Sequence, residues 1–401
     1  MATSTTTTVD WIYKRNYRPG QVADLATRGR PLFHMAKKID DFTGSAYYYS
    51  MRAGNPASVG KTFSTVQTNS GVMKGKQFAA TRVKSYGDIK LDGEAIMASR
   101  DNPGAFMKLV TETTDAAIDE MCDRIAFEMY RDGKGVRGRA TTIATNLLTV
   151  GTADARNFKV DMVLVVSSLS TGLSIRTGGT GQMIVTNVDE DAGTITVDDA
   201  AAYTGFTTND YLYATTDQAA CIEGLAAIIP LTAPVVGTDS FRGVDRSADA
   251  NRYAGARIDD TATNIEENAG LLAVKVSSRG KKADLLLLNP LNTWVVARRL
   301  NSQVVYDTDK SSVTYGFETL MISTPAGTLK CVSDHHCPTN RGYIGKLSTL
   351  ELHTLGAAPH IIADDKQQMA RVYNADSVEA RLRFMGNLVI TDPACWGVFS
   401  I

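Results

Sequence analysis

The feature that most constrains this chain is a polar excursion followed at once by a long amphipathic helix. Residues 45–52 (SAYYYSMR) and 77–91 (QFAATRVKSYGDIKL) have the composition of two strands, whereas residues 53–76 between them contain few large apolar side chains. An isolated two-stranded ribbon is marginally stable in water, and a structureless loop of about 20 residues is unusual in a compact domain. We therefore expect another molecule to cover this ribbon, most simply a second copy of the chain.

A single long helix is predicted directly after the ribbon, over residues 102–132. Asn102 suits the N-cap, Pro103 the first helical position, and Gly133 the position after the last turn. An apolar stripe at helical spacing is formed by Ile118, Cys122, Ile125 and Met129. Charged side chains are expected on the other faces, at Glu112, Asp115, Asp119, Asp123 and Glu128. A coiled coil is the alternative, but the stripe covers too few heptads and contains too little Leu.

Composition limits the number of domains and the classes of protein to which the chain can belong. The chain of 401 residues is long enough for two or three domains, and its formal net charge of −1 favours neither nucleic acid nor an anionic membrane. Five scattered cysteines do not resemble a secreted disulfide framework, so reduced thiols are expected. Residues 1–10 lack the regions of a signal peptide, and the longest apolar runs, 225–230 and 285–288, are too short to cross a bilayer. We expect a soluble protein made in the cytoplasm.

Residues 1–39 are interpreted as a polar N-terminal arm. Its Thr-rich tip is expected to be disordered, and a short helix is predicted near 21–28. The large apolar side chains of the arm, too few for a core but enough to lie along a partner, include Leu25, Leu32, Phe33 and Met35.

Residues 136–217 change character and are interpreted as an inserted all-β module. Strands are predicted at 146–150, 162–167, 182–188, 194–197 and 211–214. A turn rich in Gly and Asp at 189–193 joins two of them in a hairpin. Five short strands in about 80 residues are typical of a small barrel or sandwich.

The remaining chain is predicted to be mixed α/β over 218–342 and rich in strands over 343–401. The expected helices and strands, in chain order, are 219–229, 261–280, 284–288, 290–300, 318–323 and 328–332. Residues 284–288 should form a strand that is buried on both faces, because the side chains after Asp284 are all apolar. Alternation of charged and apolar residues from Glu379 to Phe384 predicts another strand.

One cluster has metal-ligand chemistry, and it consists of Cys331, His335, His336 and Cys337. Thiolates and imidazoles this close could bind zinc, but three adjacent ligands are awkward for a tetrahedral site. The simpler interpretation is a strand that ends in a polar turn. Neither a Gly-x-Ser-x-Gly elbow nor a Walker phosphate loop occurs, and the glycines of 172–181 do not precede a helix. We expect no catalytic site, cofactor or metal, with a metal-dependent enzyme at this cluster as an alternative.

The ribbon carries a local excess of basic side chains, at Arg52, Lys61, Lys74, Lys76, Arg82 and Lys84. Nucleic-acid binding would favour basic residues interleaved with exposed aromatics or gathered on one helix. Because these residues lie on a projecting hairpin, we expect them to contact another subunit and pair with its carboxylates.

The order of these parts resembles the major capsid proteins of tailed bacteriophages. Residues 315–329 (YGFETLMISTPAGTL), 334–338 (DHHCP) and 341–344 (RGYI) look like that family's buried strand, Pro-Gly turn and returning strand. Residues 376–389 (DSVEARLRFMGNLV) look like its peripheral strand. The resemblance covers most of the chain except 136–217.

The resemblance implies an α+β chain with the Hong Kong 97-like capsid fold. Its implied parts are an N-arm (1–39), an extended E-loop hairpin (40–92), a long spine helix of the peripheral domain (93–135), an inserted β-barrel-like domain (136–217), an axial domain (218–342), and peripheral strands with the C-terminus (343–401). It also implies a structural protein and no enzyme. Such proteins assemble as hexamers and pentamers of an icosahedral shell around double-stranded DNA.

The implied partners follow from the same resemblance. They are other copies of the chain, a separate scaffolding protein, a portal, a decoration protein and packaged DNA bound without sequence specificity, with no membrane. The implied location is the virion capsid, assembled in the host cytoplasm. An encapsulin-like nanocompartment protein, with the same fold around enzymes in place of DNA, is the alternative.

Some relatives join their subunits by an isopeptide bond between a ribbon lysine and a peripheral asparagine. In this chain the candidates would be Lys61, Lys74 or Lys76 with Asn387. Unreactive surface lysines are the simpler expectation, and particles boiled in detergent should then release only monomer.

Overall fold

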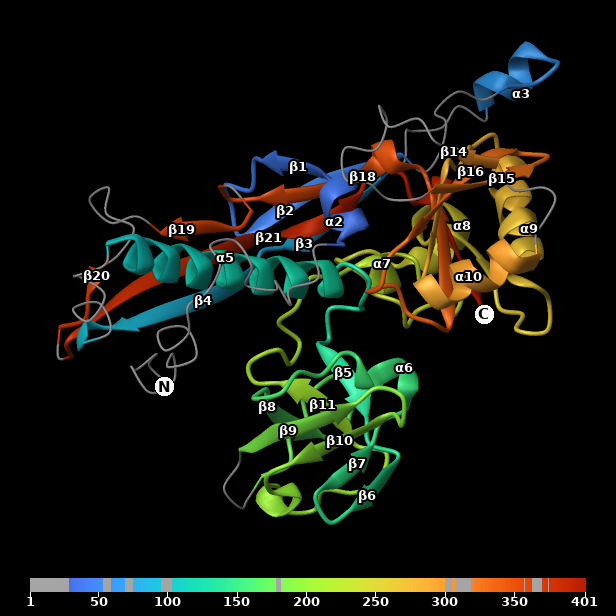
Figure 1. Ribbon diagram of the computed structural model, residues 1–401. Coiled ribbons are helices and arrows are strands. Elements are labelled where there is room, and N and C mark those ends of the chain that lie inside the picture. Colours follow the sequence, from blue (N-terminus) through green and yellow to red (C-terminus); the bar gives the residue numbers. More distant parts are fainter. Residues whose placement is uncertain are drawn as a thin grey trace.

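A computed structural model describes ten segments of the chain: residues 29–52, 59–68, 75–94, 103–177, 182–299, 305–307, 319–356, 358–362, 370–373 and 375–401. Figure 1 shows a long sheet with one helix lying along it, a second sheet flanked by shorter helices, and a small β domain to one side. None of the helices in these segments is long and apolar enough to span a bilayer.

The long sheet is organised around β21 (Ser377–Ile390), and we call it the β21 sheet. Its other strands are β1 (Lys37–Asp40), β4 (Val83–Asp92), β18 (Leu350–Thr354), β19 (His360–Ile362) and β20 (Ala370–Arg371). Strands β4, β18, β19 and β20 run antiparallel to β21, and β1 runs parallel to β18. Helix α5 (Pro103–Glu128) packs along this sheet and buries Ile125 of the predicted apolar stripe.

The second sheet, which we call the β13 sheet, contains seven strands. In spatial order they are β12 (Ala256–Ile258), β22 (Gly397–Ser400), β17 (Arg341–Gly345), β13 (Leu285–Leu288), β16 (Gly327–Ser333), β15 (Thr319–Thr324) and β14 (Val305–Asp307). Its helices are α7 (Leu225–Ile228), α8 (Ala250–Tyr253), α9 (Ile265–Ser277) and α10 (Pro290–Arg299).

Strand β13 confirms the prediction of a strand buried on both faces. Successive side chains of a strand point to opposite faces. Leu285 and Leu287 belong to the core shared with α5 and the β21 sheet. Leu286 and Leu288 belong to a second core, which includes Leu272 of α9. One cluster of buried side chains therefore joins the β21 sheet to the β13 sheet.

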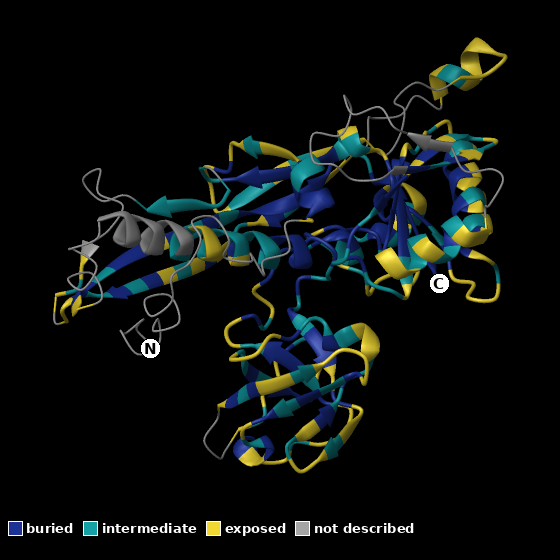
Figure 2. Ribbon diagram, in the orientation of Figure 1, coloured by how far each residue is buried: buried dark blue, intermediate teal, exposed yellow. Residues whose placement is uncertain are grey.

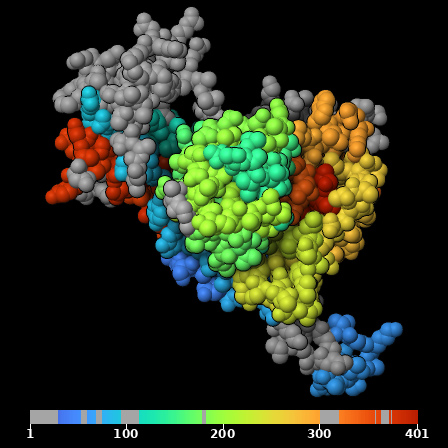
Figure 3. Space-filling view, turned by 90° about the horizontal axis from the view of Figure 1, so that it is seen from below, coloured from blue at the N-terminus to red at the C-terminus, as the bar shows by residue number. Residues whose placement is uncertain are grey.

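The inserted β module has a hydrophobic core of its own, which includes Leu148, Ile195 and Leu212. Its strands form one sheet in the order β5 (Val136–Arg139), β11 (Tyr211–Ala214), β8 (Val163–Ser167), β9 (Met183–Asp189), β10 (Thr194–Val197), β7 (Leu147–Thr149) and β6 (Thr142–Ala144), with helix α6 (Thr152–Ala155) beside it. All five predicted strands are present, and β5 and β6 are additional. Figure 3 shows this module standing in front of the two large sheets when the molecule is seen from below.

The ribbon differs from the sequence expectation in two ways. Its strands β2 (Ala46–Arg52) and β3 (Gly75–Thr81) pair antiparallel, but the predicted return arm breaks at Arg82 and continues as β4 in the β21 sheet. The connecting residues 53–76 were expected to be structureless, yet they contain helix α3 (Phe63–Thr68).

Other local expectations also differ from the structure. The helix expected at 219–229 is reduced to the single turn of α7. Glu128 was expected on a polar face of the long helix, but it is 1% exposed. Its carboxylate is satisfied there by a hydrogen bond from the main-chain N–H of Ile222. Residues 343–401 are divided between two sheets, since β22 lies in the β13 sheet. The helix expected near 21–28 lies outside the described segments.

The N-terminal arm also contributes to the core of its own chain. Helix α2 (Pro31–Met35) buries Leu32 and Phe33 in the core shared by the two large sheets. The expectation that these apolar residues serve only to contact a partner is therefore wrong for the described part of the arm.

Candidate functional site

The base of the ribbon is covered by its own chain. Tyr49 of β2 stacks on Phe78 of β3 with ring centroids 5.3 Å apart, and Phe78 contacts Tyr253 of α8 at 5.9 Å. These rings and Val244 form a small separate core. The expectation that a second molecule must cover the whole ribbon is therefore wrong for its base.

Arg242 fixes the direction of the ribbon through several hydrogen bonds. Its guanidinium donates to Glu223 Oε2 at 2.6 Å, to the Tyr49 hydroxyl at 3.0 Å and to the Leu388 carbonyl at 2.8 Å. Its own carbonyl accepts from the N–H of Ala79 at 3.1 Å. The ribbon is thus bound to β21 through Leu388 and to the segment that precedes α7 through Glu223.

The described part of the ribbon tip is exposed. Helix α3 buries no residue, and Phe63 and Val59 are 82% and 94% exposed. Figure 2 shows α3 almost entirely in the exposed colour, away from both large sheets. Contiguous exposed apolar patches mark interaction surfaces, and Phe63 and Val59 are candidates for such a surface at the tip.

The structure places five of the six basic candidates, and it does not bring them together at one point. Lys61 lies next to the tip helix, and Arg52 and Lys76 lie at the outer end of the β2–β3 pair. Arg82 and Lys84 lie at the break between β3 and β4. Four of these residues are exposed and Arg82 is half-buried, which leaves Arg52, Lys61, Lys76 and Lys84 accessible to a neighbour. Lys74 lies outside the described segments.

Asn387, the candidate for an intersubunit isopeptide bond, is fully buried. Its Nδ2 donates to the Thr81 carbonyl at 2.8 Å, and its Oδ1 accepts from the N–H of Glu223 at 3.3 Å. The side chain therefore connects the ribbon base to β21, and no lysine of a neighbour could reach it in this conformation.

The Cys331, His335, His336 and Cys337 cluster does not form one site. Cys331 and Cys337 belong to two different hydrophobic cores. Burial raises the pKa of Cys331 to about 12 and raises the pKa of Cys337 well above its ordinary value, so both thiols are protonated at neutral pH. The two histidines instead face Asp123 on helix α5.

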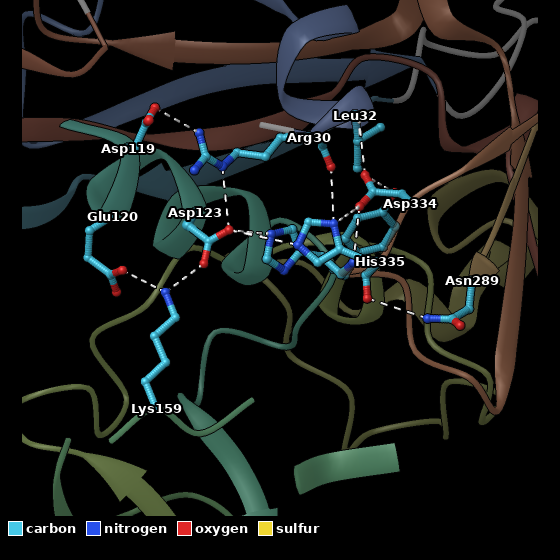
Figure 4. A network of polar contacts seen from close by, with 12 residues as sticks. Arg30, Leu32, Asp119, Glu120, Asp123, Lys159, Asn289, Asp334 and His335 are labelled. Atoms are coloured by element: carbon cyan, nitrogen blue, oxygen red, sulfur yellow. Dashed lines mark hydrogen bonds and ion pairs between the residues drawn. The ribbon is translucent and has the colours of Figure 1, made fainter. Parts of the chain in front are cut away.

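Asp123 is the centre of a polar network that joins three parts of the chain (Figure 4). His336 Nε2 lies 3.0 Å and Arg30 Nε 3.4 Å from Asp123 Oδ1, and Lys159 Nζ of the inserted module lies 2.9 Å from Oδ2. Burial opposes ionisation of Asp123, but hydrogen bonds from His335, His336 and Lys159 outweigh burial and hold its pKa well below the ordinary value. Burial lowers the pKa of His336, against an opposing hydrogen bond with Asp123.

The inserted module is held by a second buried contact near its attachment. Asp217 at the end of the module pairs with Arg124 of α5 and, at 3.3 Å, with Arg137 of β5. Asp217 is 1% exposed, whereas the side chain of Arg124 is 30% exposed, so the carboxylate is the buried partner. The module therefore contacts helix α5 at both Asp123 and Arg124.

Sequence reasoning missed the residues that organise these contacts. Arg242, Asp123 and Lys159 are charged residues with no motif around them, and their partners lie far away in the chain. The one available signal was the adjacent pair His335 and His336. It identified the correct turn, but it grouped the histidines with Cys331 and Cys337, whereas their neighbour in the structure is Asp123.

Comparisons with known proteins identify the fold. No protein-family model matches the sequence, and no curated protein is significantly similar to it. Among solved structures, a chain of the cyanophage A-1(L) capsid asymmetric unit matches over 96% of both chains with 13% identity and a TM-score of 0.54. The encapsulin in the holo-SrpI complex of Synechococcus elongatus PCC 7942 matches over 100% of this chain and 96% of its own, with 8% identity and a TM-score of 0.50. The chain therefore has the fold of capsid and encapsulin shell proteins.

Proposed function

We propose that this protein is the major capsid protein of a tailed phage, which assembles as hexamers and pentamers into an icosahedral shell. The observation that carries the proposal is the similarity to the cyanophage A-1(L) capsid chain, which extends over nearly the whole of both chains. In this chain the paired strands β2 and β3 precede the long helix α5, which is the expected order of ribbon and helix and supports the proposal. The proposed role is structural, and none of its steps is a chemical reaction.

The geometry supports assembly through the ribbon tip. The base of the ribbon is fixed to β21 and to the segment before α7 by Arg242 and Asn387, whereas Phe63 and Val59 at the tip are exposed. A rigid base with an apolar tip suits an element that reaches onto a neighbouring subunit. In this assignment the exposed basic residues Arg52, Lys61, Lys76 and Lys84 flank the apolar contact and pair with carboxylates of the neighbour.

The shell is proposed to enclose double-stranded DNA without sequence-specific contacts. The formal net charge of −1 supports packing that relies on counterions more than on a basic inner surface. A separate scaffolding protein, a portal and a decoration protein are the further partners of this assignment. The inserted module provides a folded surface for decoration or for contacts within a hexamer.

An encapsulin-like nanocompartment is the second candidate, because the SrpI encapsulin matches the whole of this chain. The two candidates predict the same shell but different contents. A phage capsid packages DNA, whereas a nanocompartment holds protein cargo.

Expression followed by negative-stain microscopy tests the proposal. We expect closed icosahedral particles from the chain expressed with its neighbouring scaffold gene. Particles from the native source should contain nuclease-resistant DNA of genome length. Protein cargo without DNA would favour the nanocompartment, and a chain that remains monomeric in every preparation would contradict both candidates.

A further inference from the structure

We propose that Asp123, His335 and His336 form a binding site for a divalent transition metal ion of the zinc type. Their donor atoms all lie within 4.8 Å of one another, and within the described segments they are the one group of three such ligands. The site differs from the cluster suggested by the sequence, because it replaces both cysteines with a carboxylate of helix α5. This inference does not depend on the proposed function.

The distances between the donor atoms suit a tetrahedral ion. His336 Nε2 is 3.0 Å and His335 Nε2 3.8 Å from Asp123 Oδ1. Zinc bonds of about 2.0–2.2 Å place neighbouring ligand atoms of a tetrahedron about 3.3–3.6 Å apart. The two distances to Asp123 lie on either side of this range, and the two imidazole nitrogens lie within 4.8 Å of each other. Movement of the imidazoles would therefore bring the three donors to tetrahedral spacing.

A hydrogen bond prepares His335 as a ligand. Its Nδ1 lies 3.0 Å from the carbonyl oxygen of Gly29, which can only accept a hydrogen bond. Nδ1 must therefore carry a proton, so Nε2, the atom that faces Asp123, is the nitrogen that would bind an ion, after release of any proton that it donates to Asp123. Metal-ligating histidines are commonly oriented by this kind of second contact.

The turn that carries both histidines is fixed by buried polar contacts. Asn289 donates from Nδ2 to the Cys337 carbonyl at 2.9 Å, and Asp334 Oδ1 accepts from the N–H of His336 at 3.0 Å. Asp334 Oδ2 accepts from the Tyr130 hydroxyl at 2.9 Å. The imidazoles are therefore held in place before any ion binds, which reduces the entropic cost of binding.

Charged side chains of both signs surround the site. Asp119 and Asp123 bind Arg30, Glu120 and Asp123 bind Lys159, and Asp334 lies behind the histidines. Arg124, Arg137, Arg156 and Glu190 line the same cavity. The one anionic ligand of the proposed ion is therefore the carboxylate of Asp123, and the surrounding charges are balanced.

The site is also accessible. Asp123, His335 and His336 line a cavity of about 380 Å³, whose opposite wall includes Phe158 and Lys159 of the inserted module. An ion can enter through this cavity, and a water molecule can take the fourth position. Because Asp123 lies on α5 and the histidines follow β16, a bound ion would link the long helix to the β13 sheet.

The test uses the purified full chain after chelator treatment, with Zn²⁺ and Co²⁺ as probes. We expect one equivalent of metal to remain after gel filtration. Bound Co²⁺ should show the visible absorption of a four-coordinate ion without thiolate charge transfer. In His335→Gln the affinity should fall by about 100-fold or more, since even outer-shell partners contribute 10- to 100-fold. His360→Gln, a histidine of β19 outside the site, is the matched control and should bind normally.

Lys159→Gln distinguishes an electrostatic effect on zinc affinity from a loss of affinity caused by structural damage to the site. It removes a cation that competes for Asp123, so we expect zinc to bind several-fold more tightly, whereas damage to the site would weaken binding. The proposal is overturned if the wild-type chain retains no metal, if His335→Gln retains it unchanged, or if the cobalt spectrum shows thiolate ligation.

Discussion

At the scale of single residues, Arg246 shows how a buried charge is paired with one carboxylate. Its side chain is 7% exposed and forms two hydrogen bonds with Asp239, at 2.8 and 2.9 Å, while Nη1 donates to the carbonyls of Ala227 and Ile228. The hydrogen bonds from the Arg246 side chain lower the pKa of Asp239, although burial by itself would raise it. The folded pKa lies below the unfolded one, so the stabilisation is present above the ordinary carboxyl pKa of about 4 and is lost as the pH falls through the folded pKa.

Asp239→Asn should therefore lower the free energy of unfolding by about 2 kcal/mol at pH 7, since hydrogen bonds to charged groups contribute about 1.5–3 kcal/mol. Urea denaturation at pH 7 and at lower pH checks this, and the difference from wild type should shrink below about pH 4. Asp132→Asn, in the exposed pair with Lys134, is the control and should change stability by less than about 1 kcal/mol. Equal effects of the two substitutions would refute this account.

Two glycines provide a matched test of packing. A Cβ on Gly345 of β17 would overlap the indole of Trp396, which is fully buried, whereas a Cβ on Gly270 in α9 would meet no atom within 4 Å. Gly345→Ala should destabilise the protein by about 1–3 kcal/mol through overpacking. Gly270→Ala should stabilise it by about 0.5–1 kcal/mol, because Ala is the better helix former. Melting temperatures that move in the same direction would contradict the packing argument.

At the scale of elements, the role proposed for the ribbon tip can be tested separately from folding. Residues 53–74 can be replaced by a short Gly-Ser turn without loss of the β2–β3 pairs, because Arg52 lies opposite Gly75 at the end of the hairpin. We expect the shortened chain to keep its unfolding midpoint but to form no stable shells, as judged by microscopy and gel filtration. Phe63→Ser should weaken assembly in the same direction, whereas Leu173→Ser, which changes a side chain 80% exposed on the inserted module, is the control. Normal shells from the shortened chain would refute the role of the tip.

Sequence patterns predicted elements with a clear local pattern, but they predicted how elements pair only where the partners are near in the chain. The strands of the inserted module alternate in polarity and end at turn residues, so β10 and β11 were predicted at their observed bounds. The course of β4 could not be predicted, because its partner β21 lies almost 300 residues later and nothing local marks the change of sheet at Arg82. The same holds for the candidate site, in which Asp123 is more than 200 residues from His336.

The inserted module should fold by itself. Its core is separate from the other cores of the described segments, and it includes Leu164, Ile195 and Leu212, all fully buried. A fragment of residues 136–217 should therefore unfold cooperatively on heating, as followed by circular dichroism. Ile195→Ala should lower its stability by about 2–4 kcal/mol, the usual range for a buried Ile to Ala change. A fragment that is disordered in solution would show that the module depends on its contacts with α5.

At the scale of the whole molecule, three clusters of contacts determine how the parts are held relative to each other. Arg242 joins the ribbon to β21 and to Glu223, Asp123 joins the arm, the long helix and the inserted module, and Asp217 joins that module to α5. Each of these side chains, or its partner, is buried. These contacts hold the described parts of the chain together at its centre, whereas the described part of the ribbon tip is exposed.

This arrangement predicts that assembled particles are not covalently crosslinked through Asn387. The side chain is fully buried, and its amide donates to Thr81 and accepts from Glu223. A lysine from a neighbour would have to open the ribbon base and leave these groups without partners, at a cost of about 1–3 kcal/mol for each buried group. Particles boiled in detergent should therefore give a single band at the monomer mass of 43.2 kDa. Ladders of higher mass that disappear in Asn387→Asp would contradict this prediction, whereas Asn387→Asp with lower thermal stability and an unchanged monomer band would support it.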